Sequence, residues 1–152
     1  MVEIRLMQQE DRKALMDYFQ SSQDEYPLSI QSDDKVYLYW DHTILEGFLI
    51  MRPLTTKVME LVSISISSDL YTIQDGLLRT AFNALDRQSI TWVVASHTAY
   101  QRLAVLQNQF GTLRDEKDCR DHLLEEKIYL DENHLTVAKV SRLFETACKG
   151  GH

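Results

Sequence analysis

The fold is decided by two neighbouring segments, Met59 to Ser68 (MELVSISISS) and Gln74 to Arg79 (QDGLLR). The first segment is rich in β-branched and apolar residues and predicts a buried strand, whereas the second has the apolar spacing of an amphipathic helix. A strand that passes through a short polar loop into a helix leaves free backbone N–H groups at one point, and such a point suits a phosphate. The sequence therefore predicts a strand–loop–helix site for an anionic ligand.

The composition is that of an ordinary globular chain. It has 152 residues, of which 44% are hydrophobic and 26% charged, so we expect one domain over residues 1–152. The formal net charge of −7 disfavours nucleic acid as a partner. No run of eighteen apolar residues and no leader pattern occurs, and the two cysteines are too few for a secreted disulfide scaffold. We therefore expect a cytoplasmic protein with no membrane partner.

The periodicity of the chain predicts a mixed α/β (α+β) sheet with helices on both faces. Its order is β-α-β-β-β-α-β-α-β-β. The strands are expected at residues 2–6, 35–40, 43–51, 58–66, 90–95, 124–130 and 134–140. The helices are expected at residues 12–19, 74–88 and 98–110, with Asp11 as the first N-cap and Gly111 just past the last helix.

The long strand changes its apolar phase between Leu61 and Val62. Met59 and Leu61 are apolar at odd positions, whereas Val62, Ile64 and Ile66 are apolar at even ones. One extra residue in a strand moves all later side chains to the other face, so a β-bulge explains the change. The alternative is a strand buried on both faces at its start, without a bulge.

This order of elements and the central segment resemble the GCN5-related N-acetyltransferases (GNAT), whose acyl-CoA N-acyltransferase fold has a bulged fourth strand splayed from the fifth. The resemblance implies acetyl-CoA as co-substrate. It implies that pantetheine lies along the backbone of Val62, Ile64 and Ile66. It also implies that the pyrophosphate is held by the turn formed by Tyr71, Thr72, Ile73, Gln74, Asp75 and Gly76.

The phosphate loop departs from the pattern of that family, which is Arg or Gln, two residues, Gly, one residue, and Gly or Ala. If Leu77 and Leu78 are the Leu pair that follows, the glycine positions fall on Thr72 and Gln74, and the basic position on Asp69. In the other register Gly76 is the last glycine. We prefer the first, because it keeps the helix in phase.

Two further positions bear on catalysis. Gln107 occupies the place where the family often has a tyrosine that protonates the leaving thiolate, and an amide has no useful pKa for that role. Glu60 lies on the bulged strand where some members place a general base, and burial beside Met59 and Leu61 would raise its pKa. The alternative for Glu60 is a solvated carboxylate at a strand edge.

Two functions remain open. The first is an N-acetyltransferase that moves acetyl from acetyl-CoA to the primary amine of a small molecule or peptide. The second is a non-catalytic GNAT-fold interaction or sensing module that has lost acetyl-CoA binding. The aromatic residues Tyr37, Tyr39 and Trp40 either line an acceptor pocket or belong to the core or to a homodimer contact.

Two Cys–His pairs are also candidates for a zinc site. Cys119 with His122, and Cys148 with His152, have spacings compatible with tetrahedral ligation. The second pair lies at the end of the sequence, where chains fray. Two unrelated thiols are the simpler explanation, and we expect no metal.

Overall fold

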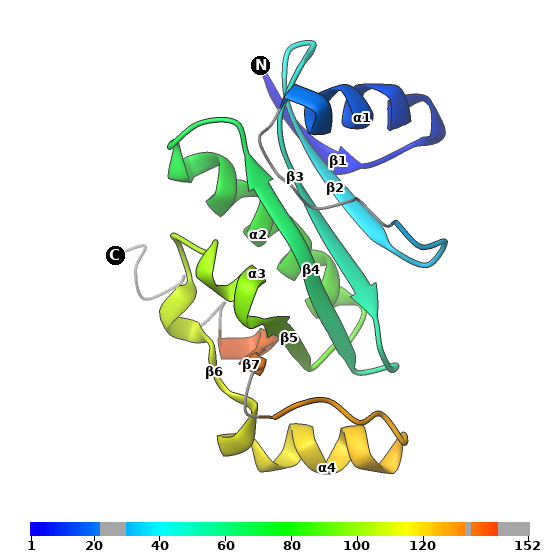
Figure 1. The fold of residues 1–152 in the computed structure, drawn as a ribbon, viewed down its shortest axis with the longest axis vertical. Coiled ribbons are helices and arrows are strands. Elements are labelled where there is room, and N and C mark those ends of the chain that lie inside the picture. Colours follow the sequence, from blue (N-terminus) through cyan, green and yellow to red (C-terminus); the bar gives the residue numbers. More distant parts are fainter. Residues whose placement is uncertain (22–29, 133–134, 143–152) are drawn as a thin grey trace.

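A computed structural model describes residues 1–21, 30–132 and 135–142. Its centre is a seven-stranded sheet in the order β1-β2-β3-β4-β5-β7-β6 (Figure 1). The strands are β1 (Val2–Leu6), β2 (Lys35–Asp41), β3 (Ile44–Pro53), β4 (Val58–Ile66), β5 (Trp92–Ser96), β6 (Gly111–Thr112) and β7 (Leu135–Lys139). The α-helices are α1 (Arg12–Ser21), α2 (Tyr71–Arg87), α3 (His97–Gln101) and α4 (Lys117–Glu125). Short 3₁₀ helices η1 (Gln9–Asp11), η2 (Gln107–Gln109) and η3 (Leu113–Asp115) connect them.

The sheet is mixed because its connections differ in length. Strands β1 to β4 pair antiparallel, with a tight turn at His42 between β2 and β3. Strands β4 and β5 pair parallel, since the seventeen-residue helix α2 provides the crossover that a parallel pair needs. The predicted mixed α/β class is therefore confirmed.

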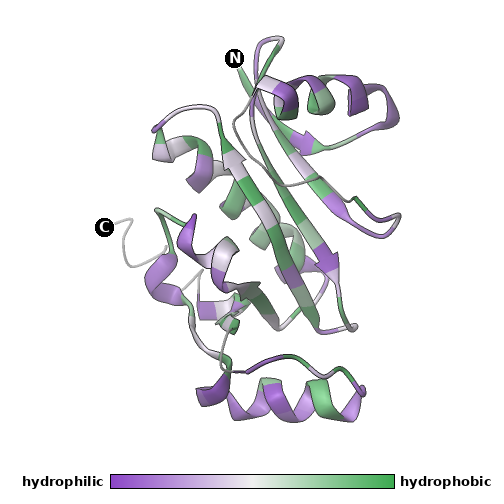
Figure 2. Ribbon diagram, viewed as in Figure 1, coloured by the Kyte–Doolittle hydropathy of each residue, from purple (hydrophilic) through white to green (hydrophobic). Residues whose placement is uncertain are grey.

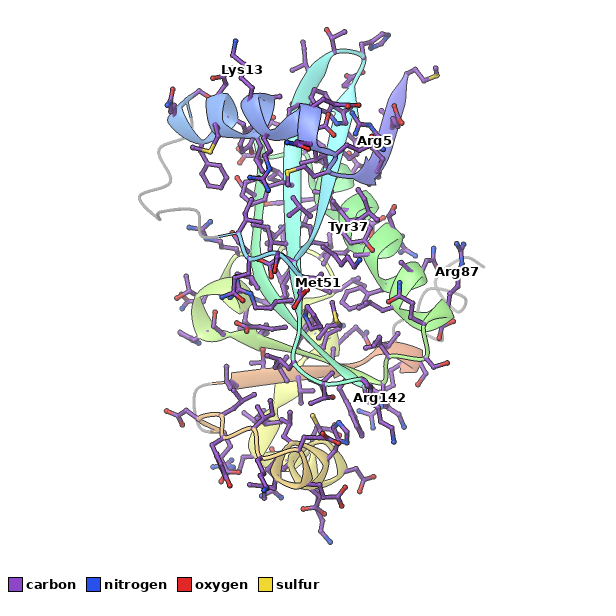
Figure 3. The ribbon with its side chains drawn as sticks, turned by 90° about the vertical axis from the view of Figure 1, so that its right-hand side faces the viewer. Arg5, Lys13, Tyr37, Met51, Arg87 and Arg142 are labelled. Carbon is purple, nitrogen blue, oxygen red and sulfur yellow. The ribbon has the colours of Figure 1, made fainter. Side chains whose placement is uncertain are left out.

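Helices cover both faces of the sheet. The apolar stripe of α2, which includes Leu77, Ala81 and Leu85, packs on β2 to β5 together with residues of α3. Helix α1 packs on the opposite face through Leu15 and Tyr18, and Figure 3 shows the sheet between these two helices. The strands of the middle of the sheet are mostly hydrophobic (Figure 2), as expected for strands buried on both faces. None of the helices in the described ranges is both long and apolar enough to cross a membrane.

Helix α4 replaces a predicted strand. The sequence predicts a strand over residues 124–130 as the first half of a hairpin, but Leu124 and Glu125 end α4, and β7 pairs with β5 and with the two-residue strand β6 instead. The reason is the spacing of Cys119 and Leu123, four residues apart, which puts both side chains on one helix face against Val58. Local β-propensity was overridden by this tertiary packing.

The ends of the helices also differ from the prediction. Helix α2 begins three residues earlier, at Tyr71, and the helix expected at 98–110 ends at Gln101. Leu106 then adopts a left-handed conformation with φ 61°, and no described glycine has positive φ, so Gly111 is not a helix C′ residue. Asp11 does not cap α1 but accepts hydrogen bonds from Arg5 Nη2 (2.8 Å) and from the N–H of Gln8 (2.8 Å).

Candidate functional site

Strand β4 contains a bulge at the place where its apolar phase changes. Ile50 of β3 lies opposite Ser63, and the next residue, Met51, lies opposite Leu61. Val62 is thus the extra residue on β4, which confirms the predicted bulge. Because of it, Leu61 and Ile64 both contribute to the core under α2, although they are three residues apart.

Beyond the bulge, β4 and β5 part. Their parallel pairing runs from Val58 opposite Trp92 to Leu61 opposite Ala95, and no described pair continues it. Strand β5 ends one residue later at Ser96, whose hydroxyl accepts a hydrogen bond from the N–H of Ala99 (3.2 Å) and turns the chain into α3. The edge of β4 from Val62 to Ile66 is therefore paired with β3 on one side and released from β5 on the other.

The N-terminus of α2 follows closely after this edge. Its N-cap residue is Leu70, which has an extended backbone and no side chain that accepts a hydrogen bond. The N–H of Ile73 is bonded to the carbonyl of Leu70 (3.0 Å), whereas those of Tyr71 and Thr72 lie in the first turn, where a helix offers no acceptor. Tyr71 is 57% exposed. The start of the helix thus presents backbone donors to its surroundings.

The other predicted loop residues have structural contacts of their own. Ile73 is buried in the core, and Gly76 lies in the second turn of α2, where a Cβ atom would come within 2.9 Å of Ile4 Cδ1. Its glycine permits close packing of the helix on the sheet. Asp75 holds Arg79 at 2.9 Å, one helical turn away. The turn expected at residues 71–76 is instead the start of α2, so the glycine positions of both registers fall within the helix, and its boundary does not choose between them.

Gln74 is a clamp between α2 and the segment after α3. Its side chain is buried, with the residue 3% exposed. Its Oε1 accepts hydrogen bonds from the N–H groups of Ala104 (2.6 Å) and Val105 (3.0 Å), and its Nε2 donates to the carbonyl of Arg102 (2.9 Å). These bonds give the Gln74 side chain a structural role.

Glu60 lies one residue before the point where the strands part, and its neighbours are charged. Arg52 is its cross-strand partner on β3. The guanidinium of Arg52 makes a two-point contact with the carboxylate of Asp34, with Nε–Oδ1 2.8 Å and Nη2–Oδ2 2.9 Å. The side chain of Asp34 is fully buried and also accepts from the N–H of Gln31 (2.8 Å).

This network sets opposite pKa shifts on its two acids. Burial raises the pKa of Glu60, and the positive charge of Arg52 opposes that effect. For Asp34, burial alone would raise the pKa, but the hydrogen bonds from Arg52 and from the N–H of Gln31 hold it below its ordinary value. The sequence singles out Glu60 but not its charged neighbours, because Arg52 reaches Glu60 through the β3–β4 register and Asp34, eighteen residues from Arg52, joins them only through that arginine.

The remaining candidates have simple structural surroundings. Gln107 donates a hydrogen bond to the carbonyl of Tyr100 (3.3 Å). Tyr37 belongs to the core under α2, which Tyr39 flanks, whereas Trp40 packs with the α1 core and lies under the guanidinium of Arg5 at 5.5 Å. The aromatic residues of β2 thus contribute to packing on both faces of the sheet.

The structure describes one of the two Cys–His pairs that could bind zinc. Cys119 is fully buried, and burial raises the pKa of its thiol to about 12, so it is a poor metal ligand. His122 Nε2 lies 2.8 Å from Thr55 Oγ1. Cys148 and His152 lie outside the described residues. Within the described ranges, no three Cys, His, Asp or Glu side chains gather as a metal site would require.

The comparisons with known proteins agree on the fold. No family model and no curated protein matches the sequence. A GNAT-family acetyltransferase from Staphylococcus aureus superposes with a TM-score of 0.61 at 14% identity, covering 92% of this chain and 99% of the other. The PaiA N-acetyltransferase from Thermoplasma acidophilum, solved in complex with coenzyme A, gives 0.61 at 15% identity, covering 91% and 99%.

A third similar structure is the ribosomal-protein-S18-alanine N-acetyltransferase from Escherichia coli. Its TM-score is 0.56 at 12% identity, and the match covers 92% of this chain and 94% of that one. The chain therefore has the fold of the GCN5-related N-acetyltransferases, as the sequence resemblance implied. At these identities the likeness concerns the fold, and the function has to be argued from the site.

Proposed function

We propose that this protein is an N-acetyltransferase that moves the acetyl group of acetyl-CoA to a primary amine. One observation carries the proposal: β4 bulges at Val62, parts from β5 after Leu61, and leads to the uncapped N-terminus of α2. A released strand edge suits the two amides of pantetheine, and free N–H groups at a helix start suit a pyrophosphate. The PaiA structure, which shares the fold, was solved with coenzyme A.

The strand edge and the helix start would each bind a different part of acetyl-CoA. Pantetheine would lie along the backbone of Val62 to Ile66, where the strand lacks its β5 neighbour. The pyrophosphate would accept hydrogen bonds from the N–H groups of Tyr71 and Thr72. Ile73, Gln74 and Gly76 contribute only by forming the helix. Ile73 is buried in the core, Gln74 bonds the segment after α3, and Gly76 packs closely on Ile4.

The chemical step is an acyl transfer. The nitrogen of the amine attacks the thioester carbonyl, the C–S bond breaks, and the electron pair leaves with sulfur. Glu60 accepts the proton of the attacking amine directly or through one water, a role that its raised pKa favours. The proton taken up by the departing thiolate comes from solvent, since Gln107 has none to give.

The acceptor is the amine of a small molecule or of a peptide. The Escherichia coli enzyme with this fold is named for the alanine of a ribosomal protein, which shows that the fold admits a peptide amine in that protein. A reducing, cytoplasmic compartment agrees with the free, buried thiol of Cys119. A homodimer stays a prediction.

A second candidate is a GNAT-fold module that senses or binds a partner without acetyl transfer. The observation in its favour is the chemistry around the α2 N-terminus. Asp69 stands at the family's basic position, and Thr72 and Gln74 at its glycine positions. Arg79, the cation of this part of α2, is already held by Asp75.

Acetyl-CoA titration and turnover separate the two candidates. The enzyme predicts one-site binding by calorimetry and release of free CoA thiol when a panel of small and peptide amines is supplied. Glu60→Gln should lower kcat/KM by about 100-fold or more, the usual contribution of a general base, and the exposed Glu10→Gln should not. No binding at millimolar acetyl-CoA would refute the enzyme and favour the module. Full turnover in Glu60→Gln would exclude Glu60 as the base.

A further inference from the structure

A hollow lies at the other end of α2, away from the proposed acetyl-CoA site. It has a volume of about 280 Å³ and lies between the β1–β2 corner of the sheet and the C-terminal half of the helix. Its lining consists of Leu6, Lys35, Tyr37, Thr80, Asn83, Ala84, Arg87 and Gln88. Arg87 is sixteen residues from Tyr71, which is about 24 Å along an α-helix.

The hollow follows from the register of the strands and the period of the helix. Leu6 lies directly opposite Tyr37, and Lys35 is two residues before Tyr37, so these side chains share the face of the sheet under α2. Thr80, Asn83, Ala84 and Arg87 follow the spacing of a single helix stripe. Figure 3 shows Tyr37 on the strand beside α2 and Arg87 near the end of that helix.

The charge of this lining is opposite to that of the chain. Lys35 and Arg87 are the charged residues of the lining, which has no carboxylate, although the protein carries a net charge of −7. Within the described residues, neither cation is part of an ion pair. Arg87 also complements the negative end of the α2 dipole, but that does not explain why Lys35, from another strand, lines the same space.

The uncharged polar groups of the hollow add donors to the two cations. Tyr37 is 5% exposed, and its ring is fixed in the core beneath the hollow. Together with Thr80, Asn83 and Gln88 it supplies two hydroxyls and two amides. The structure as described shows no side-chain hydrogen bond for any of these four residues, so they remain available to a ligand.

We propose that this hollow is a binding site for a small phosphate-bearing molecule. A phosphate offers several oxygens to donors on both sides, so that Arg87 of the helix and Lys35 of the strand contact it together. The phenol of Tyr37 donates from the floor. The apolar side chains of Leu6 and Ala84 leave room for a small organic part. The site is independent of acetyl transfer and needs none of its residues.

Inorganic pyrophosphate, titrated at constant ionic strength and followed by amide NMR shifts and calorimetry, tests the proposal. We expect saturable shifts at Tyr37, Thr80 and Asn83. Lys35→Gln/Arg87→Gln should weaken binding about tenfold or more, since two charges that face the ligand are removed. Tyr37→Phe, which keeps the buried ring, should weaken it measurably.

The matched control is Arg12→Gln/Lys13→Gln, which changes the net charge equally on exposed positions of α1. It should bind pyrophosphate as the parent does. Shifts that do not saturate in the millimolar range, shifts confined to the α2 N-terminus, or equal binding by the Lys35/Arg87 variant would overturn the proposal. Binding of citrate without binding of pyrophosphate would overturn the assignment to phosphate. Loss of the proposed acetyltransferase activity bears on none of these results.

Discussion

A proline at the first position of α2 removes one proposed phosphate donor without breaking the helix. Tyr71 is that first residue, and its N–H has no intrahelical acceptor. Proline is favoured at this position. The preceding residue, Leu70, has φ −77° and ψ 97°, an extended conformation that tolerates a following proline. Tyr71→Pro therefore deletes the backbone donor, and Tyr71→Ala deletes the side chain alone.

The expected loss in affinity follows from the strength of one hydrogen bond to a charged group. Such a bond contributes about 1.5–3 kcal/mol, which corresponds to a factor of about 10 to 150 in Kd. Tyr71 is 57% exposed, so removal of its ring should change stability little. Both variants should unfold within about 1 kcal/mol of the parent, because neither removes an intrahelical bond.

The assay is calorimetric titration of acetyl-CoA into the parent and the two variants, with urea unfolding as the control for folding. We expect Tyr71→Pro to bind at least about tenfold more weakly than Tyr71→Ala. Equal affinities for the two variants, both folded, would refute the reasoning, because the N–H would then not contact the ligand. A loss shared by both would instead assign the contribution to the aromatic ring.

Three further predictions concern the clamp and the acidic network. Gln74→Ala should lower the free energy of unfolding by about 1–3 kcal/mol, because the buried Gln74 side chain no longer bonds the N–H groups of Ala104 and Val105; an unchanged urea midpoint contradicts it. Arg52→Met should move the acidic limb of the kcat/KM–pH profile to higher pH, since Arg52 lowers the pKa of Glu60; a limb that stays in place argues against Glu60 as the base. The folded pKa of Asp34 lies below its ordinary 3.8, so its stabilising effect is complete above that value and is lost as the pH falls through the lower folded pKa. The stability gap between the parent and Asp34→Asn should accordingly be constant at neutral pH and shrink in acid, and a gap independent of pH would contradict it.

The sequence predicts well where burial is regular. The β1 to β4 meander, α2 and β5 follow from apolar periodicity, and the phase change at Val62 locates the bulge to the residue. A bulge is visible in one sequence because it reverses the alternation of all later side chains. This signal is local, and it holds whatever the strand packs against.

The sequence predicts poorly where long-range packing decides. The segment 124–130 has strand-forming residues. Its first residues are nevertheless helical, because Cys119 and Leu123 of α4 pack on Val58. The helix expected to Phe110 ends at Gln101, since the following turn is held from outside by Gln74. No pattern along the chain reports such a clamp, because its partners are about thirty residues away.

The site shows the same division. The bulge that precedes the released edge from Val62 to Ile66 could be predicted, since it follows from one strand, whereas the role of Glu60 stays a prediction. Arg52 and Asp34 could not be predicted, because their relation to Glu60 depends on the β3–β4 register and on the burial of Asp34. The start of α2 could not be predicted either, since residues 71–76 were assigned to a turn and the structure puts all of them inside the helix.

The central claim is that acetyl-CoA occupies the parting of β4 and β5 and the start of α2. The most direct measurement is a residue-resolved NMR titration of the full chain with acetyl-CoA. The account predicts saturable amide shifts that are largest from Val62 to Ile66 and from Leu70 to Ile73. No saturable shift at millimolar acetyl-CoA, or shifts centred on the hollow of Lys35 and Arg87, would contradict it.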